Sequence, residues 1–185
     1  MAETLSTMLP LGTALPAFAL VDAVSGRTIT DREAAGAQGM LVMFICNHCP
    51  FVKHVLTEME RVATEYGARG IGVVAINAND LATYPQDGPG PMKELAAERG
   101  WRFPFLFDAT QEVARAFGAA CTPDFFAFDA AGRLAYRGRL DESRPGSATP
   151  VTGRDLRGAL DAILAGRAPA ADQKPSVGCN IKWTG

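Results

Sequence analysis

Two cysteines separated by two residues, Cys46 and Cys49, carry the clearest chemical signal in this sequence. They follow a continuous apolar run at residues 40–45 and precede apolar residues that recur at helical spacing over residues 51–63. Two intervening residues bring the sulfurs within reach of a disulfide, and we expect both sulfurs in the first turn of the helix. A C-x-x-C pair at the joint between a strand and a helix is typical of thiol–disulfide chemistry.

The predicted helix gives the two thiols different roles. Free amides and the helix dipole favour an anion at a helix N-terminus, and therefore a thiolate. We expect Cys46 to be the more exposed sulfur and the nucleophile, and Cys49 to resolve the mixed disulfide. A positive charge on His48, between them, would further favour the Cys46 thiolate. The alternative for His48 is a solvent-facing spacer.

A zinc site is the alternative interpretation of these cysteines. Structural zinc takes four ligands, usually from a second pair at similar spacing, and Cys121 and Cys179 do not form one. The sequence therefore predicts no metal site. Metal carriage through Cys46, His48 and Cys49 remains a weaker alternative.

The elements around the pair indicate an α/β fold. The apolar runs at residues 40–45 and 71–76 are typical of strands buried on both faces, and the helix between them completes a right-handed βαβ unit. Further strands are expected at residues 17–21, 27–30, 124–128 and 134–137, and further helices at residues 91–99, 110–117 and 155–164. Residues 168–185 contain too few apolar residues for an element of their own and should lie against the body.

Length and composition exclude several classes of protein. The chain has 185 residues, 48% of them hydrophobic, which fits one soluble domain with its own core. Eighteen basic and 20 acidic residues give a net charge of −2, so nothing predicts binding to nucleic acid. No apolar run reaches the roughly 20 residues that span a bilayer. The first ten residues lack the basic start of a secretory signal, so we expect a cytoplasmic protein.

The chain resembles the thioredoxin superfamily, and more closely its peroxiredoxin-like redoxins, relatives of the alkyl hydroperoxide reductase and thiol-specific antioxidant family that carry a C-x-x-C. The resemblance spans nearly the whole chain and is carried by residues 44–54, 118–126, 141–146 and 178–183. It implies a single thioredoxin-like domain over residues 1–185. A central mixed sheet flanked by helices would carry an N-terminal extension, an insertion near residues 77–100 and a C-terminal tail at residues 168–185.

The resemblance also gives a role to Thr122 and Pro123, which stand just before the aromatic strand at residues 124–128. It implies that Pro123 is a cis-proline beside the C-x-x-C and that the backbone of Thr122 pairs with an extended substrate segment. The alternative for Pro123 is a trans residue that begins a strand.

Two departures from these families matter. Ile45 stands where thioredoxins usually have tryptophan. Cys46 occupies the position of the peroxiredoxin threonine, and no arginine lies near residues 121–124, so peroxide attack by Cys49 lacks its usual electrostatic support. Cys121 and Cys179 are candidate accessory thiols, with the tail bringing Cys179 near Cys121 or the active pair; the alternative is that both are inert.

The sequence therefore predicts a thiol–disulfide oxidoreductase that uses Cys46 and Cys49 without a cofactor. Expected substrates are protein or small-molecule disulfides, and electrons would come from a dithiol protein such as thioredoxin or from glutathione. One alternative is a thiol-dependent peroxidase with an antioxidant role, in which Cys49 attacks hydroperoxides. The second is a non-catalytic redox-sensing or binding module.

Overall fold

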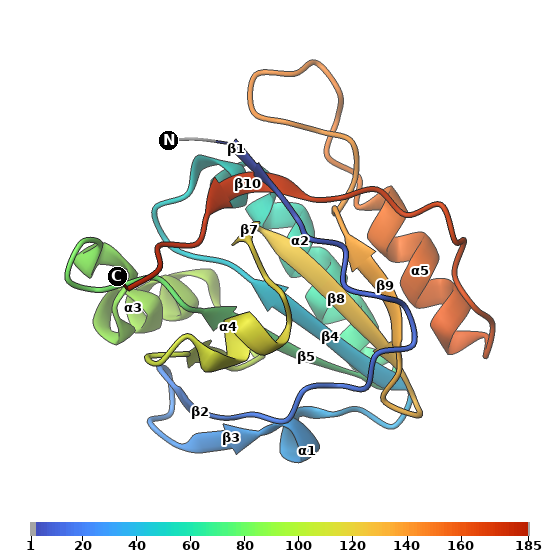
Figure 1. Cartoon of the computed structure of the whole chain (residues 1–185), viewed down its shortest axis with the longest axis horizontal. Coiled ribbons are helices and arrows are strands. Elements are labelled where there is room, and N and C mark those ends of the chain that lie inside the picture. Colours follow the sequence, from blue (N-terminus) through green and yellow to red (C-terminus); the bar gives the residue numbers. More distant parts are fainter. Residues whose placement is uncertain (1–2, 185) are drawn as a thin grey trace.

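The centre of the protein is a mixed β-sheet with the strand order β3–β2–β6–β5–β4–β8–β9 (Figure 1). The computed structural model describes residues 3–184. Its strands are β1 (Glu3–Leu5), β2 (Ala19–Asp22), β3 (Thr28–Thr30), β4 (Gly39–Phe44), β5 (Ile71–Asn77), β6 (Phe105–Phe107), β7 (Cys121–Thr122), β8 (Asp124–Asp129), β9 (Leu134–Gly138) and β10 (Val177–Asn180). Its helices are α1 (Asp31–Ala34), α2 (Pro50–Ala68), the short 3₁₀ helix η1 (Pro85–Asp87), α3 (Pro89–Arg99), α4 (Glu112–Ala116) and α5 (Arg154–Leu164).

The predicted βαβ unit is present as β4, α2 and β5. Strands β4 and β5 meet where the Ile45 amide donates to the Ile76 carbonyl oxygen over 3.0 Å. On its other edge β4 pairs antiparallel with β8 along its whole length, from Gly39 opposite Asp129 to Phe44 opposite Asp124. β4 is therefore a central strand, and its carboxyl end delivers the chain directly to the C-x-x-C segment.

Both faces of the central strand are covered, which explains its uninterrupted apolar sequence. Leu41 and Met43 pack into a core with α2 and α5, whereas Val42 and Phe44 pack into a second core that includes Phe117, just after α4. Figure 1 shows α4 in front of the sheet and α2 behind it. Within residues 3–184, no helix is long and apolar enough to cross a membrane.

The tail forms a strand, so the prediction that residues 168–185 lack an element of their own was wrong. β10 pairs antiparallel with β1 on one side, where Gly178 lies opposite Thr4, and with β7 on the other, where Cys179 lies opposite Thr122. The small sheet β1–β10–β7 needs only free backbone edges from its partners, because the ladder bonds come from main-chain groups. A low apolar content therefore did not prevent the tail from pairing.

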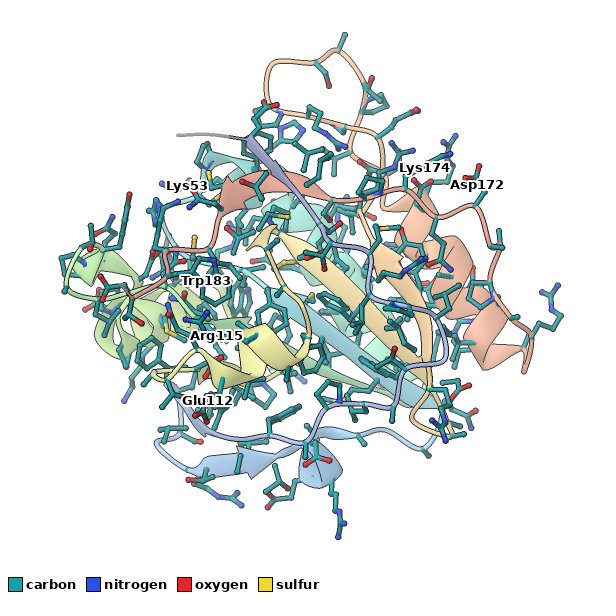
Figure 2. The ribbon with its side chains drawn as sticks, viewed as in Figure 1. Lys53, Glu112, Arg115, Asp172, Lys174 and Trp183 are labelled. Carbon is teal, nitrogen blue, oxygen red and sulfur yellow. The ribbon has the colours of Figure 1, made fainter. Side chains whose placement is uncertain are left out.

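Side chains beyond β10 fix the end of the tail. Figure 2 shows Trp183 beside Arg115 of α4, and the Arg115 guanidinium carbon lies 4.6 Å from the centre of the indole ring. The Lys182 ammonium lies 5.3 Å from the centre of the Tyr84 ring. Contacts of this kind each contribute about 0.5–1 kcal/mol at exposed sites. The tail is thus attached to α4 and to the loop that carries Tyr84.

Candidate active site

The C-x-x-C segment lies in a bend between β4 and α2, not within the helix. Cys49 is the N-cap residue, with extended φ and ψ angles of −66° and 122°, and the helix begins at Pro50. Proline is favoured at the first helical position and moves the preceding residue out of helical geometry. The prediction that both sulfurs sit in the first helical turn was therefore wrong, since Cys46 precedes the helix.

Both sulfurs of the pair are buried. Cys46 is 1% exposed and Cys49 is 0% exposed, so the expectation that Cys46 is distinctly exposed is not met in this arrangement. The Cys46 sulfur lies 3.5 Å from the Thr122 hydroxyl, and the Cys49 sulfur lies 3.2 Å from the Thr122 carbonyl oxygen. Both cysteines are free thiols. The structure therefore describes the reduced pair.

The two thiols have opposite acidities. The hydrogen bond from Cys46 lowers the pKa of Cys49 well below its usual range, with further lowering from Thr122, Cys179 and the Val52 amide of α2. The pKa of Cys46 is raised because Cys46 donates to Cys49, is buried, and lies near the Asp87 carboxylate. The negative charge is thus better stabilised on Cys49. Because Cys49 rather than Cys46 is the N-cap of α2, the preference of the helix N-terminus for an anion acts most directly on Cys49. The thiolate at Cys46 stays a prediction.

His48 faces a buried carboxylate that the sequence did not identify. Its Nδ1 lies 2.5 Å from Oδ2 of Asp87 and 3.7 Å from the Cys46 sulfur. The ring stacks on Tyr84, with 4.7 Å between ring centres. A proton on Nδ1 is therefore donated to Asp87. The negative charge of Asp87 cancels much of the field that a positive His48 would exert on the Cys46 sulfur. The predicted support of His48 for the Cys46 thiolate is therefore largely offset.

Asp87 organises the segment between the two cysteines. Its side chain is fully buried, and Oδ1 accepts from the backbone amides of Asn47 and His48 at 2.9 and 3.2 Å. Its Oδ2 also accepts from the Asn79 side-chain amide at 2.9 Å. Charge-assisted bonds of this kind are about twice as strong as neutral ones. The loop after β5 therefore lines the site, and the polar residues at 77–80 were the signal for it.

Cys46, His48 and Asp87 bring one sulfur, one nitrogen and one oxygen within 4.8 Å of one another. Such a group is a candidate for a metal ion. The Asp87 carboxylate already has four hydrogen-bond partners, two on each oxygen, so its role in this group is to support the C-x-x-C segment.

The Thr122–Pro123 peptide bond is cis, as the resemblance implied, and lies beside the cysteine pair. The backbone of Thr122, however, is paired with Cys179 of the tail. A Cβ atom on Gly178 would lie 2.0 Å from the Thr122 carbonyl oxygen, which shows how closely the two backbones approach. The expectation that Thr122 pairs with a substrate segment is therefore not met in this arrangement, because the tail occupies that edge.

The remaining cysteines lie on different sides of the small sheet. Cys179 is 2% exposed and interacts with the Cys49 sulfur, whose pKa it helps to lower. Cys121 is fully buried; its thiol points toward the Pro123 carbonyl oxygen at 3.7 Å, and burial raises its pKa. Of the two positions expected for Cys179, the structure gives the one near the active pair.

The family profile described as Redoxin matches residues 10–156, which include the cysteine pair and the cis-proline. The chain belongs to the redoxin family. It adopts the thioredoxin-like fold that the sequence predicted. A solved structure of an uncharacterized conserved protein from Geobacillus kaustophilus is 50% identical to this redoxin, with a TM-score of 0.97 over 100% of this chain and 97% of the other.

Two further relatives extend the comparison. A hypothetical protein from Sinorhizobium meliloti is 45% identical, with a TM-score of 0.95 over 98% of each chain. The thiol-disulfide oxidoreductase ResA of Halalkalibacterium halodurans is 29% identical over 111 residues, or 57% of this redoxin. The match spans only 55% of that relative. Together with the family, it supports an oxidoreductase that works through thiols.

Proposed function

We propose that this redoxin is a thiol–disulfide oxidoreductase whose redox couple is Cys46 and Cys49. The observation that carries the proposal is the placement of both free thiols at the start of α2 against the same residue, Thr122, beside its cis-proline. The Cys46 sulfur lies 3.5 Å from the Thr122 hydroxyl and the Cys49 sulfur lies 3.2 Å from the Thr122 carbonyl oxygen. A pair held in this way can close to a disulfide with little movement of the backbone. The similarity to a relative named as a thiol-disulfide oxidoreductase supports the same activity.

The proposed reaction uses both thiols in sequence. Cys46 gives its proton to the Cys49 thiolate, attacks a substrate disulfide and releases the first substrate thiolate. Cys49 then gives that proton to the released thiolate, attacks the Cys46 sulfur and releases the second substrate thiolate, which takes a proton from water. A Cys46–Cys49 disulfide remains. The substrate gains two electrons and the enzyme loses two. A dithiol protein or glutathione would return the enzyme to its reduced form, in the cytoplasm.

Reduction of hydroperoxides is a second candidate, favoured by the lowered pKa of Cys49. A thiolate is the form that attacks peroxide. Among residues 3–184, however, no arginine hydrogen-bonds either sulfur, so a departing hydroxide has no cationic partner at the pair. Exchange with disulfides does not need that support, and we therefore place it first.

A stopped-flow comparison separates these activities. Fully reduced protein is mixed with hydrogen peroxide or with a small disulfide at equal concentration, and formation of the Cys46–Cys49 disulfide is followed. We expect the disulfide to react faster, and Cys46→Ser to abolish closure of the pair while Cys121→Ser leaves it unchanged. A faster reaction with peroxide would replace the proposal by the peroxidase. Oxidation without turnover in either case would indicate a redox sensor.

A further inference from the structure

We propose that Cys179 is a third redox-active thiol, which accepts the disulfide from the active pair by forming a Cys49–Cys179 bond. This inference rests on the proposed function, because the disulfide it receives is the one formed between Cys46 and Cys49. It assigns a chemical role to the tail strand, which lies outside the residues that the family profile matches.

The register of the small sheet directs Cys179 at the pair. Residues directly opposite in an antiparallel ladder point to the same face of the sheet. Cys179 lies opposite Thr122, and the Thr122 hydroxyl lies 3.5 Å from the Cys46 sulfur. The face that carries the Cys179 thiol is therefore the face that covers the active pair. Cys46, Cys49 and Cys179 belong to one buried cluster with the first residues of α2.

The surroundings of Cys179 are a second observation. Its side chain is 2% exposed and packs in the same buried cluster as Cys46 and Cys49. Burial raises the pKa of the Cys179 thiol to about 12, and the nearby Cys49 sulfur adds to this rise. The small sheet and the Trp183 contact fix the tail in this place.

The pleat of the same strands excludes Cys121 as the thiol that accepts the disulfide. Cys121 precedes Thr122 by one residue and lies opposite Asn180, so its side chain points to the other face of the sheet. Its thiol points toward the Pro123 carbonyl oxygen rather than toward either active cysteine. Cys121 therefore provides a matched control, because it is a buried cysteine of the same small sheet whose side chain points to the other face.

The exchange step balances without another reactant. The Cys179 sulfur attacks the Cys49 sulfur of the Cys46–Cys49 disulfide, a Cys49–Cys179 bond forms, and the Cys46–Cys49 bond breaks. Cys46 leaves as a thiolate and takes up the proton that Cys179 loses. No electrons are gained or lost overall. The product ties the tail to the start of α2 and returns Cys46 to its reduced form while the protein stays oxidised.

Disulfide mapping tests this step. The full-length protein is reduced and then oxidised with oxidised glutathione, and the exchange is stopped in acid before free thiols are alkylated under denaturing conditions. Mass spectrometry of the peptides identifies each bond. We expect two oxidised species, one with Cys46–Cys49 and one with Cys49–Cys179 and an alkylated Cys46. Cys179→Ser should lose the second species, and Cys121→Ser should retain it.

The possible results distinguish this inference from the proposed function. A Cys46–Cys49 bond without any Cys49–Cys179 bond in the wild-type protein overturns the inference and leaves the proposed function intact. Absence of both bonds refutes the proposed function. Because the decisive species is mapped in the wild-type protein, the result does not depend on the folding of a variant. A second species that persists in Cys179→Ser would show that another thiol accepts the disulfide.

Discussion

Replacement of Asp87 by asparagine should lower the pKa of Cys46. The Asp87 carboxylate is buried, and its negative charge is one of the causes that raise this pKa. Asparagine keeps the shape of the side chain but removes the charge, so a thiolate at Cys46 no longer faces a carboxylate. The effect is best measured in a Cys49→Ser background, where Cys46 is the only thiol of the pair and the coupling between the two titrations is absent.

The structure sets the size of the effect. The Cys46 sulfur and the Asp87 carboxylate oxygen lie within 4.8 Å of each other. Two unit charges at that separation repel by about 3 kcal/mol at an effective dielectric constant of about 20. Removing this repulsion corresponds to roughly a hundredfold larger thiolate fraction at a pH below the pKa of Cys46. The asparagine oxygen can still accept from two of these partners, but its NH2 group faces the other two, so the free energy of unfolding should fall by about 2 kcal/mol.

The assay is the rate of alkylation of Cys46 as a function of pH, with the modified peptide identified by mass spectrometry. The midpoint of the profile reports acidity, whereas its height also depends on how often the buried site opens. Asp80→Asn is the matched control, because the Asp80 side chain bonds only to Ala82 and Thr83 of its own loop. A midpoint that stays unchanged or rises in the Asp87 variant would refute this electrostatic account.

Three further changes test the tail, the threonine and a buried acid. Gly178→Ala places a Cβ 2.0 Å from the Thr122 carbonyl oxygen, so the tail strand should separate from β7. The free energy of unfolding should fall by about 1–3 kcal/mol, and Cys46 should be alkylated roughly tenfold faster. Thr122→Val removes a hydroxyl that lowers the pKa of Cys46, so the midpoint of the alkylation profile should rise. The free energy of unfolding should fall by about 1 kcal/mol, because the hydrogen bond is lost. Asp124 is fully buried, no side chain within residues 3–184 hydrogen-bonds its carboxyl group, and burial raises its pKa. The free energy of unfolding of Asp124→Asn, measured with urea, should therefore exceed that of wild type by more than about 1 kcal/mol at neutral pH and by little below pH 4.

Each of these changes has its own control or contradiction. Gly158→Ala, in α5, meets no atom within 4 Å and should leave the alkylation of Cys46 unchanged. An unchanged midpoint in the threonine variant would show that its hydroxyl does not stabilise the thiolate. For Asp124, the folded state holds its proton above the pH at which the unfolded chain releases it, so wild-type stability falls as pH rises through that window. Parallel stability curves for wild type and variant would contradict this.

Local patterns in the sequence determined the strand–helix–strand unit and the position of the cysteine pair. The apolar run before Cys46 is long enough for a strand and too regular for a loop, and the helical spacing after Pro50 shows which face packs inward. These signals depend on neighbours in the chain, so they were visible without a structure. The strands β8 and β9 and the helix α5 were predicted for the same reason.

Only the tertiary structure decided which groups surround the two thiols and which segment covers them. The pKa values of Cys46 and Cys49 depend on Asp87 and Thr122, which lie far from the pair in sequence, and burial makes such charges act strongly. The tail formed a strand because Thr122 offered a free backbone edge, a property that no side-chain pattern in residues 168–185 records. The sequence therefore located the candidate redox pair, and long-range pairing decided which charges surround that pair and which segment covers it.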